Sequence, residues 1–372
     1  MAGLPHLAKA DASWHHARPP PLVRNYAIMI IPLAGGILLA LVVGTLLQPL
    51  ILRLLRSAAI LDIPSERSSH STPVPRGGGV GVVAAAGLAL LLNEHARPIA
   101  IPLLFFAAIG LLEDLRGAPI RLRLLLQLLA GVATGLVLVP GGQSLPIHVV
   151  LVLALAAWLI SYVNAFNFMD GINGISAVHA ALSGAVYAVL GVLTDLPLLT
   201  AAGSLIAAAS LTFLPWNAWA AKVFLGDVGS YALGGALSTI AAYAIVRGTP
   251  PEASVAPLAL YLADTGWTLL RRISKGEAWY RPHRNHAYQR LTDGGWSHQR
   301  VTATTAIIGA AVAGCLVTAS FSGPVARVAL DAAALAILAA YLAAPAWLNA
   351  QRAQPSPEGR TIHGRTVSST SR

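Results

Sequence analysis

The sequence predicts an all-α polytopic integral membrane protein. Of its 372 residues, 56% are hydrophobic and only 11% are charged, whereas soluble domains carry about 25% charged residues. Apolar segments of about the length needed to cross a bilayer follow one another along the chain, and basic residues gather on one side of them. We therefore expect about ten to eleven transmembrane helices, with functional loops that face the cytoplasm.

Hydropathy defines eleven apolar segments. They cover residues 26–50, 78–93, 98–112, 122–139, 147–163, 174–192, 196–214, 230–246, 254–270, 301–321 and 326–348. The first is too long for the core of a signal peptide, so we interpret it as a helix. Together they predict one transmembrane domain over residues 26–348, with disordered polar tails at 1–25 and 349–372.

The basic residues give the orientation. If the loop after the first segment is cytoplasmic, that side and the C-terminal tail hold all of the 25 Lys and Arg residues except Lys9, Arg18, Arg24, Arg97, Arg247 and Arg327. Cytoplasmic loops retain Lys and Arg, so the asymmetry supports this topology. The net charge of +10 reflects the same bias, and we do not expect nucleic-acid binding. The single cysteine, Cys315, excludes a disulfide framework and a cysteine zinc site.

Acidic residues gather at segment ends on the predicted cytoplasmic side. They are Asp62, Glu66, Glu113, Asp114, Asp170, Asp227 and Asp264. One acid at a helix end is usually a solvated boundary residue, but five helix ends on one face favour a shared site, because acids at a membrane boundary tend to be functional.

Two of these acids precede predicted helix starts. Asp227 lies between Gly226 and Gly229 in FLGDVGSYALGG, and Asp170 precedes Gly171 in NFMDGINGIS. Helix N-termini attract phosphate. A carboxylate beside a phosphate needs a bridging cation, and Mg²⁺ is the usual cation for oxygen ligands. The two motifs together predict a Mg²⁺-diphosphate site.

A basic loop, YRPHRNHAYQRLTDGGWSHQR, follows the ninth segment. His283, Arg284 and His286 can donate charge-assisted hydrogen bonds to phosphate oxygens. For Arg271 and Arg272, an anchoring role at anionic lipid remains the favoured alternative. A zinc site at the two histidines has no third ligand to support it.

The motifs in their order along the chain resemble those of the polyprenyl-phosphate N-acetylhexosamine-1-phosphate transferase family, over about residues 45–345. NAFNFMDGINGI is similar to the family's NxxNxxDGxDGL, and FLGDVGS to its FxGDxGS. LLEDLRG is similar to the paired-aspartate motif, and PHRNHAYQRL to the histidine loop. The resemblance implies Mg²⁺-dependent transfer of a sugar phosphate from a UDP-sugar to undecaprenyl phosphate, with release of UMP. Mn²⁺ is an alternative metal, and a homodimer is left open.

The resemblance also implies residue roles. The metal ligand is Asp227, and the catalytic group is Asp114, Asp170, Glu113, Asn167, His283 and His286. The substrate-binding group is Asn173, Asn217, Phe224, Arg284, His70, Arg76 and Arg121. Within it, Asn217 and Phe224 match positions that contact the uridine base. The enzyme would lie in the bacterial inner membrane and start the assembly of a cell-surface polysaccharide.

Two residues depart from the family pattern. Glu113 replaces the first Asp of the pair and keeps the charge, and Asn173 replaces the second Asp of DGxDG. An Asn carbonyl can accept a hydrogen bond from uracil, which suits a nucleotide-binding role. The arginine-rich loops look closer to the branch that initiates O-antigen of lipopolysaccharide than to the peptidoglycan branch.

Two other functions stay open. A secondary transporter would place polar residues near mid-bilayer in broken helices and would show an inverted repeat, whereas the acids here lie at helix ends. A non-catalytic lipid- or nucleotide-sugar-binding relative is the second alternative, because of Glu113 and Asn173.

Overall fold

A computed structural model describes residues 21–64, 72–278 and 283–353. Its elements are α1 (Pro21–Ser57), β1 (Leu61–Asp62), β2 (Val74–Pro75), α2 (Gly79–Leu92), α3 (Arg97–Arg116), α4 (Ile120–Leu138), α5 (Leu145–Met169), α6 (Ile175–Leu193), α7 (Pro197–Leu211), α8 (Leu214–Asn217), α9 (Gly226–Val246), α10 (Pro251–Val255), η1 (Ala256–Leu258), α11 (Ala259–Ser274), α12 (Ala287–Asp293), α13 (His298–Ser320) and α14 (Pro324–Ala353). Of the tails predicted at 1–25 and 349–372, residues 1–20 and 354–372 lie outside the described residues, whereas residues 21–25 begin α1 and residues 349–353 end α14.

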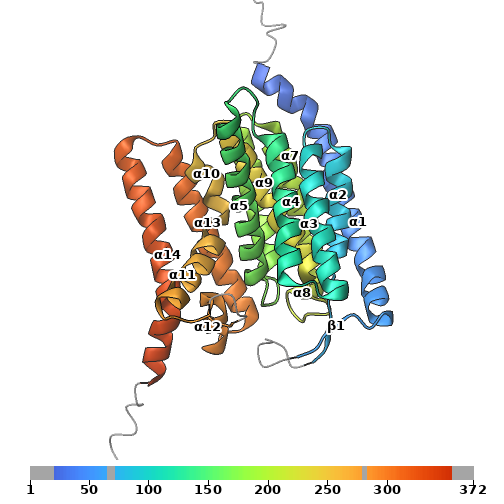
Figure 1. The fold of residues 1–372 in the computed structure, drawn as a ribbon, viewed down its shortest axis with the longest axis vertical. Helices are drawn as coiled ribbons and strands as arrows, with labels where there is room; N and C mark the ends of the chain where they lie inside the picture. The colour runs from blue at the N-terminus through green and yellow to red at the C-terminus, as the bar shows by residue number, and fades with distance from the viewer. Residues whose placement is uncertain (1–20, 65–71, 279–282, 354–372) are drawn as a thin grey trace, which may run out of the picture.

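The all-α membrane class is confirmed. Within the described ranges, nine helices are long and apolar enough to cross a membrane, and α2 is a shorter apolar helix. Helix α9 lies at the centre of the bundle, where it packs against α2, α3 and α5, and 89% of its candidate span is buried. Helices α1 and α14 lie at opposite edges (Figure 1), with only 11% and 17% buried.

The apolar segment at 254–270 differs from the continuous helix that we expected. It is divided into α10, η1 and α11, with Pro251 at the start of α10 and Pro257 in η1. Proline lacks the backbone N–H that a continuous helix needs. Helix α11 also carries polar and basic residues and does not qualify as a candidate span. Through this broken element, the chain returns to the end of the bundle at which α9 begins.

Small residues bring α9 close to its neighbours. A Cβ atom on Gly110 of α3 would lie against the backbone carbonyl of Asp227, and one on Gly79 of α2 would meet the backbone of Gly229. Small residues at such contacts let membrane helices approach each other closely. They set the N-terminus of α9 beside the C-terminus of α3.

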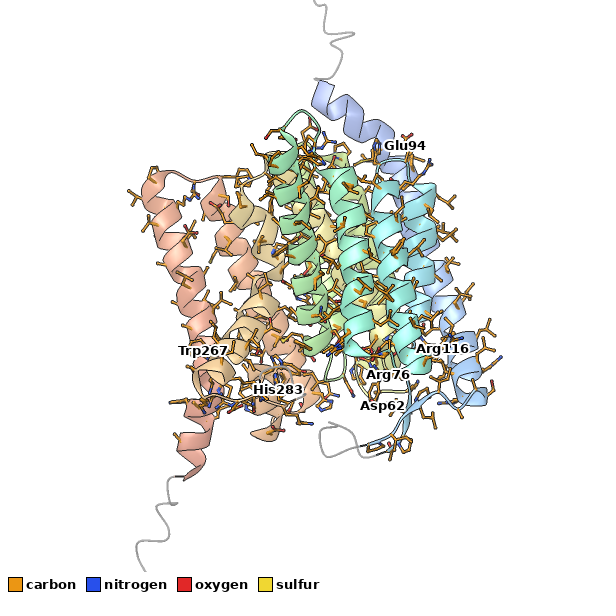
Figure 2. The ribbon with its side chains drawn as sticks, viewed as in Figure 1. Asp62, Arg76, Glu94, Arg116, Trp267 and His283 are labelled. Carbon is orange, nitrogen blue, oxygen red and sulfur yellow. The ribbon has the colours of Figure 1, made fainter. Side chains whose placement is uncertain are left out.

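The predicted functional residues share one end of the bundle. Figure 2 shows Asp62, Arg76, Arg116 and His283 at this end and Glu94 at the other. The end of α3, the end of α5, the start of α9 and the loop before α12 therefore meet on one face, as the sequence predicted.

The packing of α3 on α9 can be tested with Gly110→Ala. The added methyl group would press on the Asp227 carbonyl, and overpacking typically costs about 1–3 kcal/mol. We expect a lower midpoint of thermal unfolding in detergent. The matched control is Gly314→Ala in α13, where no atom lies within 4 Å of the added Cβ. Equal midpoints for the two variants would contradict the close approach.

Candidate active site

Arg76 joins two acids that come from different helices. Its Nε lies 2.9 Å from Asp114 at the end of α3, and its terminal nitrogen lies 2.7 Å from Asp227 at the start of α9. The Arg76 side chain is 37% exposed, whereas those of Asp114 and Asp227 are 2% and 11% exposed. The guanidinium thus pairs with two largely buried carboxylates, offsets one of their two negative charges, and still reaches the surface.

Asp114 also holds the N-terminus of α9. Its two carboxylate oxygens accept hydrogen bonds from the backbone N–H groups of Asp227 (3.0 Å) and Val228 (2.9 Å). These are two of the unpaired donors at a helix start, where negative charge is favourable. Gly226 makes the preceding turn with a φ of +76°, which glycine adopts without strain.

The loop before α2 is bound to the loop before α9. Arg76 and Phe224 form a parallel bridge, and the N–H of Gly78 donates to the carbonyl of Phe224 at 2.8 Å. The N–H of Phe224 in turn donates to the carbonyl of Pro75 at 2.8 Å. This backbone pairing positions Arg76 beside Asp227.

The end of α5 supplies the third side of the cluster. The amide nitrogen of Asn167 donates to Asp227 at 2.7 Å and to the hydroxyl of Ser230 at 3.0 Å. Asp170 caps the same helix at its C-terminus. Burial, reinforced by the negative charges of Asp227 and Asp114, raises the pKa of Asp170 to about 7. The three acids therefore share one electrostatic environment.

Asn217 and Asn173 shape the neighbouring loop. The side-chain oxygen of Asn217 accepts from the N–H of Gly174 at 2.6 Å, and its nitrogen donates to the carbonyl of Val223 at 3.0 Å. The backbone carbonyl of Asn173 accepts from Thr302 of α13 at 2.8 Å. Asn217 thus ties two loops of the site together through backbone groups, and its contact with uridine stays a prediction.

Asp264 of α11 anchors the histidine loop. Its side chain is fully buried and accepts from the backbone N–H groups of Ala287 (2.9 Å) and Tyr288 (3.3 Å) and from the hydroxyl of Tyr341 (2.7 Å). The ring nitrogen Nδ1 of His286 lies 3.3 Å from the same carboxylate. The sequence shows Asp264 as an acid near a helix end, but gives no sign of these partners.

The histidine loop is also tied to α5. The hydroxyl of Tyr288 donates to the carbonyl of Phe168 at 2.9 Å, and the ring of His286 lies 6.1 Å from the ring of Phe168. The rings of His283 and His286 are 5.1 Å apart. Burial, together with the nearby His286 and Arg272, lowers the pKa of His283 to about 4, so His283 is neutral at neutral pH.

One family model and several known proteins are similar to this chain. Residues 97–245 match the model of glycosyl transferase family 4. A probable undecaprenyl-phosphate N-acetylglucosaminyl 1-phosphate transferase of Bacillus subtilis is 26% identical over 75% of this chain and 83% of its own length. A decaprenyl-phosphate N-acetylglucosaminephosphotransferase of Mycolicibacterium smegmatis is 33% identical over 64% of this chain and 70% of its own. A phospho-N-acetylmuramoyl-pentapeptide-transferase of Staphylococcus epidermidis is 26% identical over 55% and 73%.

The chain belongs to glycosyl transferase family 4. This result confirms the resemblance to the polyprenyl-phosphate N-acetylhexosamine-1-phosphate transferases. The family's paired-acid motif can now be placed in the fold. Only its second member, Asp114, lies in the cluster with Arg76.

Glu113 faces another part of the fold. Its carboxylate accepts from the N–H of Ala118 at 2.9 Å and lies 3.6 Å from Arg123 of α4. Successive residues of a helix point about 100° apart, so neighbouring acids need not face one site. Glu113 therefore holds the turn between α3 and α4, and its predicted catalytic role is not supported by a contact with the cluster.

The remaining predicted residues occupy three kinds of position. Arg121 is exposed in the first turn of α4, and Phe224 is partly buried. Arg284 forms an ion pair with Asp293 at 2.9 Å. His70 lies outside the described residues.

The donor set fits a divalent cation that substrate would help to hold. In the described part of the chain, no three His, Cys, Asp or Glu residues converge as a metal cage. Mg²⁺ usually keeps several waters and binds one or two carboxylates together with substrate phosphates. Asp227 and Asp114 supply such carboxylates, and Arg76 shows that a positive charge is accommodated between them.

The anchor at Asp264 can be tested with Asp264→Asn. An amide has one acceptor oxygen and no charge, so it cannot satisfy the donors that meet this carboxylate; each charged hydrogen bond contributes about 1.5–3 kcal/mol. We expect faster trypsin cleavage after Arg290. The control is Asp293→Asn, whose side chain is 52% exposed and whose ion pair contributes about 0–1 kcal/mol. Equal cleavage rates would refute the anchor.

Proposed function

We propose that the protein transfers an N-acetylhexosamine-1-phosphate from a UDP-sugar to undecaprenyl phosphate, with release of UMP. The observation that carries the proposal is the cluster of Arg76, Asp114 and Asp227 at one end of a membrane-embedded bundle. The cluster places two acids that can bind a metal cation beside an arginine that can bind phosphate. It lies at an end of the bundle, where the phosphate of a membrane lipid would lie. The names of the Bacillus subtilis and Mycolicibacterium smegmatis relatives describe the same kind of transfer.

This end of the bundle would face the cytoplasm of a bacterial inner membrane. Figure 2 shows Arg76 and Arg116 at this end. The sequence assigns most of the Lys and Arg residues to the same side, and loops rich in these residues stay on the cytoplasmic side. UDP-sugars are cytoplasmic compounds, so this orientation supplies the substrate. The lipid phosphate would reach the same face from the inner leaflet.

The reaction joins two phosphate groups, so charge neutralisation dominates. The second pKa of a phosphate monoester is about 6, so the lipid phosphate is mostly dianionic at neutral pH and needs little help from a base. Its oxygen attacks the phosphorus that bears the sugar, the bond to the UMP oxygen breaks, and UMP leaves with the electron pair. We favour this direct displacement over an aspartyl-phosphate intermediate.

Named residues divide this task. Asp227, with Asp114, would hold Mg²⁺, which supplies positive charge to the phosphate oxygens. Arg76 is partly exposed and can donate to a phosphate oxygen. Asn167 fixes the rotation of the Asp227 carboxylate through its 2.7 Å hydrogen bond. His283 and His286 would contact the diphosphate or the sugar from the histidine loop.

The sugar and the polymer are the finer part of the proposal. The Bacillus subtilis and Mycolicibacterium smegmatis relatives are named for N-acetylglucosamine, which favours UDP-N-acetylglucosamine among the N-acetylhexosamines. The Staphylococcus epidermidis relative is named for a pentapeptide-bearing sugar, and its similarity covers a smaller share of this chain (55%). Assignment to O-antigen initiation stays a prediction, and cell-wall polysaccharide is the other destination.

The role of Asp227 can be tested with Asp227→Asn, measured as UMP release from UDP-N-acetylglucosamine and undecaprenyl phosphate. Loss of the charge removes the proposed metal ligand, and removal of one electrostatic contact at a reacting centre costs about 100- to 1000-fold in rate. The control is Glu94→Gln, whose side chain is 77% exposed at the other end of the bundle. Near-normal turnover by a folded Asp227→Asn protein would reject the assignment.

Metal dependence is a separate test on the unmodified protein. We expect EDTA to stop UMP release, Mg²⁺ to restore it and Mn²⁺ to restore part of it, because two anions must be brought together. Full turnover in EDTA would exclude the metal. UDP-sugar binding without turnover would identify a non-catalytic relative, and substrate flux without UMP would identify a transporter.

A further inference from the structure

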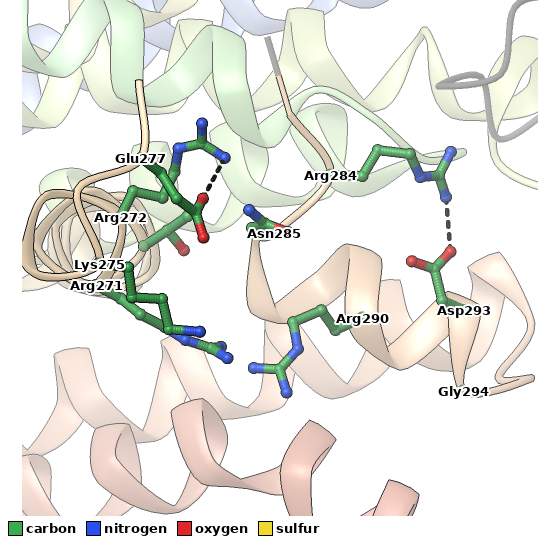
Figure 3. A pocket seen from close by; sticks show the side chains of 10 residues that line it. Arg271, Arg272, Lys275, Glu277, Arg284, Asn285, Arg290, Asp293 and Gly294 are labelled. Atoms are coloured by element: carbon green, nitrogen blue, oxygen red, sulfur yellow. Dashed lines mark hydrogen bonds and ion pairs between the residues drawn. The ribbon is translucent and has the colours of Figure 1, made fainter. Parts of the chain in front are cut away.

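A second basic site lies between α11 and α12. Five cations, Arg271, Arg272, Lys275, Arg284 and Arg290, line a cavity of about 350 Å³ together with two acids, Glu277 and Asp293. Figure 3 shows the side chains of Arg271, Lys275 and Arg290 turned toward one another. The cavity shares no lining residue with the cluster of Arg76, Asp114 and Asp227.

The two acids of this cavity are already paired. Glu277 lies 3.0 Å from Arg272, and Asp293 lies 2.9 Å from Arg284. Within the ranges that the structure describes, no ion pair joins Arg271, Lys275 or Arg290 to an acid. Among the described residues, three cations thus face one space without an ion-pair partner of their own.

Their proximity is unfavourable in the unliganded protein. Arg271 lies in the last turn of α11, and Lys275, four residues further on, caps the same helix end, so the two like charges repel each other. Partial burial lowers the pKa of Arg290, and the charge of Arg271 lowers it further. An anion in the cavity would relieve this repulsion.

The neighbouring face of α11 indicates where that anion comes from. Trp267, Leu270 and Ile273 are 52%, 63% and 52% exposed. An amphipathic helix with exposed apolar residues beside basic ones lies in the membrane interface, where Trp is enriched. The cavity therefore opens at the level of lipid headgroups.

We propose that Arg271, Lys275 and Arg290 bind the phosphate of an anionic membrane lipid. A soluble phosphate compound has the same recognised group, but it would make no use of the exposed apolar face of α11. The bound headgroup would fix α11, and with it Asp264, which anchors the histidine loop. The proposal does not depend on the transferase reaction.

The test uses the full-length protein in detergent, titrated with phosphatidylglycerol and followed by native mass spectrometry and by the midpoint of thermal unfolding. Each cation near a membrane surface changes the affinity about fivefold, so Arg271→Gln, Lys275→Gln and Arg290→Gln together should weaken binding about a hundredfold. The Arg271→Lys variant keeps the charge and should keep the lipid. Arg53→Gln, an exposed position of α1, is the matched control.

We expect the unmodified protein to retain phosphatidylglycerol and gain thermal stability, with no equal gain from phosphatidylcholine, inorganic phosphate or UMP. Loss of both effects in the triple variant, with both kept in Arg271→Lys and Arg53→Gln, would support the site. Unchanged retention in the triple variant would overturn it. Equal stabilisation by inorganic phosphate or UMP, lost in the triple variant, would overturn the lipid assignment. If the triple variant does not fold, the single Arg290→Gln variant takes its place in the same comparison. We expect this variant to bind phosphatidylglycerol about fivefold more weakly.

Discussion

The ion pairs of Arg76 with Asp114 and Asp227 are the constraint on which the site depends. Two carboxylates with little exposure to water would repel each other if no cation lay between them, and an unpaired buried charge is strongly destabilising. Because Asp114 also accepts from the start of α9, the same contacts fix a helix end. The loop before α2, the end of α3 and the start of α9 must therefore keep one arrangement, which the small residues between these helices permit.

The histidine loop is also held by a buried carboxylate that contacts several segments. Asp264 collects donors from α12 and from Tyr341 of α14, and Tyr288 then joins α12 to the end of α5. Asn167 at that end contacts Asp227. Hydrogen bonds, together with the backbone at the end of α5, thus connect Asp264 with Asp227. The histidine loop and the acid cluster therefore keep a fixed relation, although their segments are far apart in the sequence. Such fixed geometry is what alignment of two phosphorylated substrates requires.

Sequence patterns predicted the membrane class and the gathering of the acids at one end of the bundle, because hydropathy and the order of the motifs can be read directly along the chain. They could not predict which member of a pair faces the site: Glu113 and Asp114 are adjacent, and only the packing of α3 on α9 separates their surroundings. The partners of Asn217 and Asp264 are likewise set by tertiary contacts. The break before α11 had a visible signal in Pro257, which hydropathy averaging over residues 254–270 concealed.

The charge balance of the cluster is the physical argument for the divalent cation that we propose. Arg76 offsets one negative charge of the pair formed by Asp114 and Asp227, and Asp170 adds a third acid nearby. Burial and the nearby negative charges together raise the pKa of Asp170 to about 7, so this acid is only partly ionised at neutral pH. A UDP-sugar and a lipid phosphate would bring still more negative charge to this place. A site with this surplus of acid can hold two such substrates only when positive charge enters with them, as a divalent ion bound to diphosphate does.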